Sequence, residues 1–439
     1  MLNKLLFKPI DNSALIAFRV LFGLLVAIES FGAIFSGWVH LAFIEPKYVF
    51  SFIGFEWLQP LPDYWMYVYY AVMGICGLLI MVGYKYRLSI ISFAILWSGT
   101  YFMQKSSYNN HYYLLILISL FMAVVPANAN FSLDSKNRPS IKSSIMPQWC
   151  TVIFIVQMFI VYTYASIAKL YPDWLDTTAV ELLLKSKRDY YIIGDVLQQK
   201  WLHYIIAYFG IAFDLLIVPL LLWKRTRKYA FLIAIVFHLF NSIVFQIGIF
   251  PYMSLALCVF FFDPKMVRKK IFKTQKVIEK SKDSTVRNKS IIMMLLIGYF
   301  VIQLILPLRH WAIKDDVLWT EEGHRLSWRM MLRARQGIIS FKAIDKANNQ
   351  TIPIQLDTYL TYKQKRSFAS KPDMIWQFAQ FIKKTYKEEV NRDVMVFVDC
   401  QVKINGKSYK PLIDPKVDLA SVKWNAFKHS PWILPSKQD

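Results

Sequence analysis

Long apolar runs recur along this chain, and they restrict its fold more than any other feature. The hydrocarbon core of a bilayer is about 30 Å thick, so a helix needs about 20 consecutive apolar residues to cross it. The sequence therefore predicts a polytopic α-helical membrane protein with eight or nine transmembrane helices, the eighth run being short enough to be re-entrant or tilted. The expected spans are Ala14–Trp38, Trp65–Gly83, Leu88–Gln104, His111–Pro126, Cys150–Ala168, Tyr204–Trp223, Tyr229–Ile247, Pro251–Phe262 and Ile291–Leu308.

The composition agrees with a membrane protein and narrows its partners. Hydrophobic residues make up 56% of the 439 residues and charged residues only 18%, which is too apolar for an ordinary soluble protein. A formal net charge of +23 would suggest nucleic acid as the ligand of a soluble chain. Here the lysines and arginines cluster in short loops between apolar runs, as the positive-inside rule describes. We therefore expect contact with membrane lipid and none with nucleic acid.

The distribution of basic residues also predicts orientation. They concentrate in the loops after the second, fourth, sixth and eighth runs, which places these loops and the N-terminus inside the cell. Nine passes then leave the chain after Leu308 outside. We expect a transmembrane helical catalytic domain over residues 1–308, including a basic cytoplasmic linker at residues 265–290. A small soluble extracytoplasmic α+β domain is expected over residues 309–439.

Two hairpins and one helix are predicted in the C-terminal part. Gly337–Ile344 and Thr351–Leu360 flank a turn-rich segment, and Val394–Ile404 and Ser408–Ile413 flank Asn-Gly, the strongest short hairpin signal. Between the hairpins, apolar residues recur at helical spacing over Pro372–Glu389.

Lys169 stands out among the charged residues because it closes an apolar run instead of lying in a polar loop. An ammonium at the edge of hydrocarbon is costly unless function requires it or the side chain reaches water. Pro172, Asp173 and Trp174 follow, which is typical of a membrane helix that ends beneath a water-facing pocket. A lysine held neutral by apolar surroundings can act there as a base.

Another polar cluster lies at the start of the fourth run, where Asn109, Asn110, His111 and Tyr112 follow one another. Amide, imidazole and phenol groups can orient a polar ring or an oxyanion where water is scarce. The alternative is an aromatic belt at the membrane interface with a solvated pair of asparagines.

Polar residues inside other spans form a third group. His238 and Asn241 lie three residues apart and share a helix face, and Asp214 lies in the preceding span. Intramembrane polar groups usually point inward and pair with one another. Interhelical hydrogen bonding without chemistry is the alternative, which the sequence alone favours. We expect Arg19 and Glu29 to be structural, paired with each other or with Asp214.

A dense mixture of aromatic, acidic, basic and methionine residues follows the last run, at Trp319–Arg333. This composition suits a loop that covers a pocket at the membrane surface. The alternative is a connector whose arginines meet lipid head groups. No metal site is expected, because the seven histidines are scattered and no pair of cysteines has ligand spacing.

Taken in order, these motifs resemble the membrane domain of vitamin K-dependent gamma-carboxylase. Several ordered motifs are far more specific than any one of them, and the likeness covers nearly the whole chain. The chain is similar to a compact, bacterial-type member of a family that includes horizontally transferred transmembrane-domain proteins, which implies a bacterial inner membrane. The matching segments are Tyr108–Leu114, Ile167–Leu170 with Asp173-Trp174, His238–Ser242 running to Phe250, Trp319–Arg333, Ile413–Asp418 and Trp424–Pro435.

The resemblance implies an enzyme that carboxylates glutamate side chains of a peptide or protein. It would use reduced vitamin K (the hydroquinone) with O2 and CO2, without metal or biotin, and release vitamin K epoxide. In the family, a lysine in the motif matched by Ile167–Leu170 deprotonates the hydroquinone, so Lys169 is the implied base and His111 the residue that assists it. The residues implied in quinone or substrate binding are Asn109, Asn110, Tyr112, His238, Asn241, Trp319, His324, Trp328, Arg329, Met330 and Met331.

Two other classes of function remain open. One is a quinone-dependent membrane monooxygenase or epoxidase that does not carboxylate. The other is a non-enzymatic quinone-binding or lipid-binding membrane protein, in which Lys169 and His111 would be structural.

Overall fold

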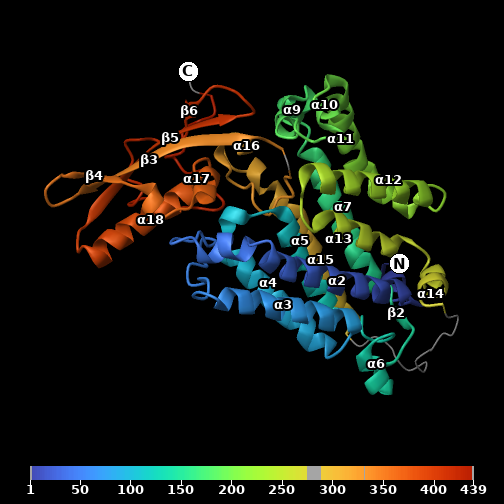
Figure 1. Cartoon of the computed structure of the whole chain (residues 1–439). Helices are drawn as coiled ribbons and strands as arrows, with labels where there is room; N and C mark the ends of the chain where they lie inside the picture. Colours follow the sequence, from blue (N-terminus) through green and yellow to red (C-terminus); the bar gives the residue numbers. More distant parts are fainter. Residues whose placement is uncertain (1, 274–287, 331, 438–439) are drawn as a thin grey trace.

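The computed structural model describes residues 2–273, 288–330 and 332–437. A bundle of helices makes up most of the molecule, and a mixed α/β region at the C-terminal end packs against one end of the bundle (Figure 1).

Six of the described helices are long and apolar enough to cross a membrane, or seven if a bent pair counts as one span. The predicted multi-pass α-helical class is therefore confirmed, whereas the number of eight or nine spans is not. The predicted fourth span corresponds to α5 (Asn110–Val124), whose 15 residues rise only about 22 Å. The predicted eighth span is the first half of the bent pair, which turns by 113°.

The bundle contains these helices together with α4 (Tyr86–Met103), which lies between α3 and α5 in the chain. The spanning helices are α2 (Ser13–Phe35), α3 (Trp65–Val82), α7 (Trp149–Ile167), α11 (Lys200–Leu222), α12 (Arg227–Phe240) with the π-helical turn that follows it, and α15 (Lys289–Ile305) with the 3-10 turn that follows it; the bent pair joins α13 (Phe250–Leu257) to α14 (Pro264–Ile271).

Glycines let α2 and α3 approach each other closely. A Cβ on Gly23 would lie 2.3 Å from the backbone nitrogen of Met81, and one on Gly77 would lie 2.7 Å from that of Ala27. Only a residue without a side chain fits such contacts, which are common where helices pack in a membrane. At these positions the glycines serve packing.

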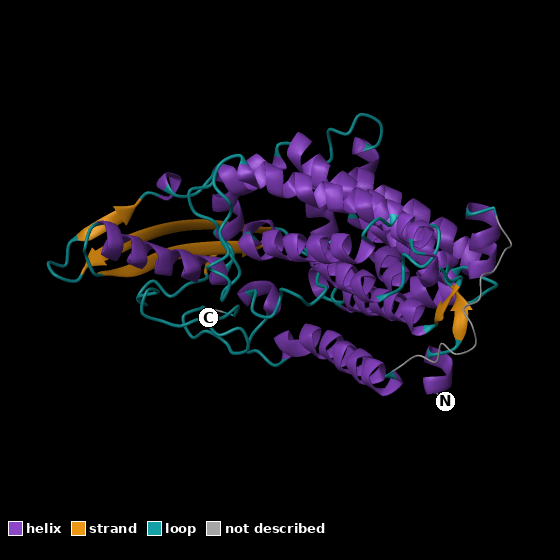
Figure 2. Ribbon diagram, turned by 90° about the horizontal axis from the view of Figure 1, so that it is seen from below, coloured by secondary structure: helices purple, strands orange, loops and turns teal. Residues whose placement is uncertain are grey.

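A short strand pair lies at the end of the bundle away from the C-terminal region (Figure 2). β1 (Pro9–Asp11) pairs antiparallel with β2 (Ile145–Pro147), and Arg268 of α14 donates to the Asp11 carboxylate at 2.6 and 3.0 Å. Lys136 and Arg268 border the same surface hollow here. Basic residues from segments far apart in the sequence thus gather at this end.

The two charged residues of α2 do not pair as expected, so that prediction is wrong. Arg19 donates to the main-chain carbonyl of Ala127 at 3.1 Å. Glu29 accepts a hydrogen bond from the Tyr112 hydroxyl at 3.1 Å. The physical reason is that Arg19 lies beside the end of α5, where carbonyl groups lack partners within the helix.

A four-stranded antiparallel sheet in the order β4-β3-β5-β6 forms the core of the C-terminal region. β3 (Arg335–Asp345) pairs with β4 (Thr351–Ile354) and, over its whole length, with β5 (Val394–Ile404), which also pairs with β6 (Lys410–Pro411). Both predicted hairpins are confirmed, although β4 and β6 are shorter than expected. The predicted helix is confirmed with the same bounds as α18 (Pro372–Glu389).

A second helix precedes α18, so the expectation of one helix between the hairpins is wrong. α17 (Tyr362–Phe368) begins after Thr361, whose hydroxyl accepts from the Gln364 amide at 3.3 Å while the Gln364 side chain accepts from the Thr361 amide at 3.0 Å. This capping box stabilises a helix too short to show a clear apolar period. Together α17 and α18 cover one face of the sheet (Figure 1).

Asp373, near the start of α18, fastens the C-terminal region to the bundle. Its carboxylate lies 3.0 Å from the ammonium of Lys105 and accepts two hydrogen bonds of 3.2 Å from Arg325. Lys105 follows α4 and is only 1% exposed. Burial alone would raise the pKa of Asp373, but Arg325 and Lys105 hold it well below its usual range. The position of the C-terminal region over the bundle is therefore fixed by a buried charge cluster.

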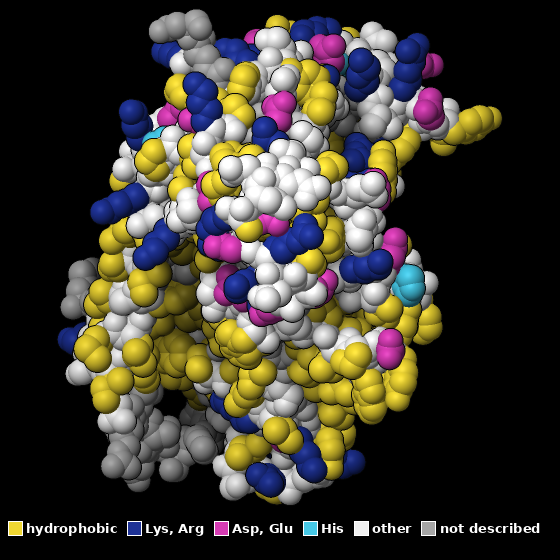
Figure 3. Space-filling model, turned by 90° about the vertical axis from the view of Figure 1, so that its left-hand side faces the viewer, with side chains coloured by type: hydrophobic (Ala, Val, Ile, Leu, Met, Phe, Trp, Pro, Cys, Tyr) yellow, Lys and Arg dark blue, Asp and Glu magenta, His cyan; other side chains and the backbone are white. Residues whose placement is uncertain are grey.

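The outer surface divides by polarity. Figure 3 views the molecule from the side of the C-terminal region, where charged side chains are scattered over the upper part and hydrophobic side chains gather over the lower part. In the last spanning helix, only 11% of an apolar 18-residue stretch is buried inside the protein. An apolar helix that faces outward in this way suits contact with lipid.

Candidate active site

Lys169 lies just beyond the end of α7 and forms an ion pair with Asp214 in the middle of α11. Its ammonium also donates to the Ala165 carbonyl at 3.3 Å and lies 5.7 Å from the centre of the Trp174 ring. The two charged side chains are 11% and 7% exposed. The expectation that only apolar groups surround Lys169 is therefore wrong. The physical reason is that a charge at a membrane span is usually paired with an opposite charge.

Two hydrogen bonds near this ion pair hold α7 and the short helix that follows it against α11. The Ser166 hydroxyl donates to the Ile211 carbonyl at 3.0 Å, and the Trp174 indole donates to the Ala207 carbonyl at 3.2 Å. Trp174 belongs to the short helix α8 (Pro172–Leu175), which turns the chain away after Lys169. The lysine therefore occupies a position that neighbouring contacts define.

His111, in the first turn of α5, lies flat against Phe250 of α13. The two ring centres are 4.1 Å apart with an interplanar angle of 17°. The His111 Nδ1 atom is buried and has no hydrogen-bond partner among the described residues. A ring held in place by stacking, with a free nitrogen, is suited to meet a polar group of a ligand.

A mostly apolar cavity brings Lys169 and His111 together inside the bundle. Helices α7, α11 and α12 contribute to its walls, as do α13 and α9 (Thr178–Lys185). We call it the apolar cavity; its lining residues are His111, Tyr162, Lys169, Trp174, Val180, Leu183, Ile206, Gly210, Asp214, Phe237, Asn241, Phe245, Ile247, Phe250 and Met330.

A second cavity, of about 570 Å³, lies between the bundle and the C-terminal region. It shares His111, Ile247 and Met330 with the apolar cavity, so the two adjoin. We call it the basic cavity, because five of its side chains are basic apart from histidine and only one is acidic. These side chains are Arg329, Arg333, Arg335, Arg366, Lys371 and the acidic Glu321.

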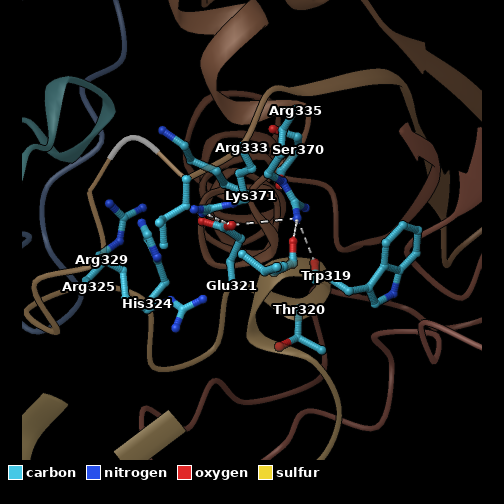
Figure 4. Close-up of polar contacts among 12 residues, drawn as sticks. Trp319, Thr320, Glu321, His324, Arg325, Arg329, Arg333, Arg335, Ser370 and Lys371 are labelled. Carbon is cyan, nitrogen blue, oxygen red and sulfur yellow. Dashed lines mark hydrogen bonds and ion pairs between the residues drawn. The ribbon is translucent and has the colours of Figure 1, made fainter. Parts of the chain in front are cut away.

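Glu321 points between two of the arginines of the basic cavity (Figure 4). It forms an ion pair with Arg333, and its carboxylate lies 3.6 Å from Arg335. Burial alone would raise the pKa of Glu321, but the guanidinium groups of Arg333 and Arg335 hold it well below its usual range. A single ionised carboxylate cannot neutralise five cations, so the cavity has an excess of positive charge.

Burial lowers the pKa of two basic side chains nearby, Lys371 and His324. It is the main cause that lowers the pKa of Lys371 to about 8, and Arg325 lowers it further. Burial, followed by Arg333, places the pKa of His324 well below its ordinary value. At neutral pH the imidazole of His324 is therefore uncharged, whereas Lys371 is still largely protonated.

Three residues predicted at the start of α5 form structural contacts at the wall of the basic cavity. Asn109 accepts from the Tyr112 amide at 2.8 Å and so caps α5. Asn110 donates to the Arg329 carbonyl at 2.9 Å and accepts from the Tyr108 hydroxyl at 2.8 Å. The bond to Arg329 attaches the loop after α16 (Val317–Thr320) to the bundle. All three residues line the cavity, together with His111.

His238 and Asn241 have separate positions although their spacing puts them on one helix face. The His238 Nε2 atom is 2.8 Å from the Tyr162 hydroxyl, and the imidazole lies behind the wall of the apolar cavity. Asn241 donates to the Phe237 carbonyl at 2.8 Å and lines the cavity. Asn241 begins a π-helical turn, η4 (Asn241–Phe245), which is a feature often found at functional sites.

The residues predicted in the loop after the last span divide into two groups. His324 and Arg329 line the basic cavity, and Met330 lines both cavities. Trp319 instead donates to the Leu434 carbonyl at 2.7 Å, and Trp328 is fully buried against the ring of Tyr113. Neither tryptophan lines either cavity. Met331 lies outside the described residues.

The structure adds residues to the site that the sequence analysis did not assign to it. Asp214 is the most informative of these, and an ionisable residue in the middle of an apolar run is a signal for a functional site. Gly210, Arg335 and Lys371 carry no such signal, because glycines are common in membrane helices and basic residues are common in soluble domains. Within the described residues, no cluster of three or more His, Cys, Asp or Glu residues could hold a metal ion.

Two family models match this chain, and no solved structure does. The model described as the HTTM domain matches residues 7–265, and the model described as the lumenal domain of vitamin K-dependent gamma-carboxylase matches residues 288–439. The first match covers the membrane helices up to the start of α14, and the second begins at α15 and includes the C-terminal sheet. The chain therefore belongs to the HTTM domain family and is a gamma-carboxylase-like multi-pass membrane protein.

Proposed function

We propose that this protein is a peptidyl-glutamate carboxylase that uses reduced vitamin K, O2 and CO2. The observation that carries the proposal is the junction of two cavities of opposite character at His111, Ile247 and Met330. An apolar quinol and an acidic side chain need different surroundings, yet they must meet to react. These two cavities provide such surroundings in direct contact.

The residues of the apolar cavity fit a quinol. Trp174, Phe237 and Phe250 offer aromatic faces to a planar ring, and Lys169 offers a polar group to a hydroxyl at its edge. The unpartnered Nδ1 atom of His111 is available for a second hydrogen bond. Reduced vitamin K, together with O2, supplies the strong base that removes the γ-proton of glutamate, which no side chain can remove.

The ion pair provides a destination for the first proton. Lys169 passes a proton from Nζ to Asp214 Oδ2 and accepts one from the quinol hydroxyl, so the ammonium is restored and the carboxyl becomes protonated. The pair then carries one positive charge beside the deprotonated hydroxyl, which stabilises the product of the transfer. Asp214 makes Lys169 an effective base although the lysine begins as an ammonium.

The basic cavity fits the carboxylate of a glutamyl side chain. Arg329 and Arg333 come from the loop after α16, Lys371 directly precedes α18, and all three line one space, where charge-assisted hydrogen bonds to an anion are strong. The apolar side chains of Ile247 and Met330 lie at the junction of the two cavities and limit the access of water to the reacting atoms there.

We propose a location in a bacterial inner membrane, and the arrangement of charges supports an orientation with the C-terminal region outside. Lys136 and Arg268 lie at the end of the bundle opposite this region, and the positive-inside rule assigns such an end to the cytoplasm. The quinol would then reach the apolar cavity from the bilayer, and the glutamyl peptide would reach the basic cavity from outside.

The test supplies purified protein with reduced vitamin K, labelled bicarbonate and a glutamyl peptide. We expect incorporation of label and formation of vitamin K epoxide, with loss of both in Lys169→Ala and partial rescue of that variant by a small exogenous amine. Epoxide without incorporation would instead support a quinone-dependent monooxygenase. Absence of both products with a range of quinols and peptides would contradict an enzymatic role.

A further inference from the structure

Gly210 has an unusual position in α11. It is buried, it lines the apolar cavity, and a Cβ added to it would meet no atom within 4 Å. Glycine in the middle of a helix is less stable than alanine, because its unfolded backbone is more flexible. The structure therefore retains an unfavourable residue where a larger one would meet no neighbour.

The other buried glycines of the spanning helices have a reason in packing. A Cβ would lie 2.3 Å from the nearest atom at Gly23, 2.6 Å at Gly74 and 2.7 Å at Gly77. Gly298 of α15 also has open space around it, but it is exposed on the outer face of the bundle. Among the glycines within described helices, Gly210 is the one that combines burial with free space.

The free space at Gly210 lies beside the ion pair. Asp214 follows Gly210 by one helical turn on the same face, and Asp214 holds Lys169. The bond from Trp174 to Ala207 lies on the other side of Gly210, and the bond from Ser166 to Ile211 lies next to it. These hydrogen bonds fix α7 and α8 against α11 close to Gly210, so the positions of the helices around the space are set by neighbouring contacts.

We infer that Gly210 is a specificity-determining residue, whose missing side chain leaves room for the edge of the quinol ring next to Lys169 and Asp214, in a cavity of only about 80 Å³. The inference rests on the proposed function and deepens it, because it identifies what sets the size of the ring that the cavity accepts. A side chain at this position would occupy part of the ring site, one helical turn from Asp214.

The test compares Gly210→Ala and Gly210→Leu with Gly298→Leu, a matched change at a helix glycine that faces outward. Binding of menadione to the protein in detergent is measured by equilibrium dialysis, and turnover is measured with a bicyclic and with a monocyclic quinol. We expect Gly210→Leu to weaken menadione binding at least 30-fold and Gly210→Ala to weaken it about threefold, which corresponds to about 2 and 0.7 kcal/mol at 1.4 kcal/mol per factor of ten. Gly298→Leu should bind as the wild type does.

Two further readouts separate specificity from folding. Gly210→Ala should raise the melting temperature, because alanine favours the helix and meets no atom, while it weakens binding. The ratio of kcat/KM for the bicyclic over the monocyclic quinol should fall about tenfold in Gly210→Leu. If Gly210→Leu does not fold, Gly210→Ala alone tests the inference, by its menadione binding and its melting temperature.

The outcomes distinguish this inference from the proposed function. Unchanged menadione binding and an unchanged quinol ratio in both Gly210 variants, with an active wild type, would overturn the role of Gly210 alone. A wild type that binds no menadione and turns over no quinol would overturn the proposed function and this inference together. An equal loss of binding in Gly298→Leu would show a general effect of leucine and would also contradict the role of Gly210.

Discussion

The ammonium of Lys169 and the carboxylate of Asp214 form an ion pair between the end of α7 and the middle of α11, with about nine-tenths of each side chain buried. Separated by 45 residues in the sequence, they meet at the wall of the apolar cavity. A buried carboxylate beside a lysine gives that lysine both a fixed position and a group with which to exchange a proton.

Removal of the Asp214 charge should stop proton transfer while the cavity still binds the quinol. We expect Asp214→Asn to lower kcat at least 100-fold, because an amide cannot take the proton that Lys169 must release, while the KM for the quinol changes less than threefold. The measurement is steady-state epoxide formation. Ser166→Ala is the control, because it removes a different bond between the same two helices. Equal losses in the two variants would show that Asp214 acts only in packing.

The charge of Lys371 should make peptide binding depend on pH. Burial lowers its pKa to about 8, so the side chain is a cation below that pH and loses its charge as the pH rises further. We expect the KM for a glutamyl peptide to be constant below pH 8 and to rise several-fold between pH 8 and 9.5. Lys371→Arg should abolish this rise, because an arginine stays charged throughout the range.

The control for Lys371 is Lys363, an exposed lysine on the neighbouring helix α17. Lys371→Met should raise the peptide KM about tenfold at pH 7, and Lys363→Met should leave it unchanged. If the rise above pH 8 persists in Lys371→Arg, another group is responsible. Lys105 is then the next group to test, because burial also lowers its pKa to about 8.

Asp373 should contribute strongly to the stability of the folded protein. Loss of its charge leaves Lys105 and Arg325 buried without a partner, which typically costs about 3–5 kcal/mol. We expect Asp373→Asn to lower the melting temperature in detergent by several degrees. Asp393→Asn removes an exposed ion pair with Lys346 and should leave the melting temperature unchanged.

The same residue gives a pH dependence of defined sign. Since the pKa of Asp373 is lower in the folded protein than in the unfolded chain, its contribution is complete above the ordinary pKa of aspartate and is lost as the pH falls below it. Wild-type stability should therefore fall more steeply than that of Asp373→Asn between about pH 4 and pH 2. Parallel curves would contradict this assignment.

The orientation can be tested with two exposed serines at opposite ends of the bundle. Ser408 follows β5 at the C-terminal region, and Ser140 lies in the 3-10 turn η3 (Pro139–Ile141) before β2. We expect a membrane-impermeant maleimide to label Ser408→Cys in intact spheroplasts and Ser140→Cys only after lysis. The four native cysteines are buried and should give little background. The reverse pattern would place the C-terminal region inside the cell.

Local sequence signals predicted several elements correctly, for identifiable reasons. The Asn-Gly turn and alternating β-branched residues defined the β5–β6 hairpin, and apolar spacing defined both ends of α18. The pairing of β3 with β5 was not predictable in this way, because 48 residues (346–393) lie between these strands. α17 was missed although its capping residues, Thr361 and Gln364, are visible in the sequence.

The sequence by itself determined that this chain spans a membrane repeatedly and that Lys169 and His111 lie near helix ends, because hydrophobicity and local spacing are properties of short segments. Only the tertiary structure decided which partner each polar group meets. Asp214 pairs with Lys169 rather than with Arg19 or Glu29. Gly210 borders free space, whereas Gly23 lies directly against the backbone of a neighbouring helix. The physical reason is that buried charges and empty volumes depend on contacts between helices, and helix packing is set by residues far apart in the chain.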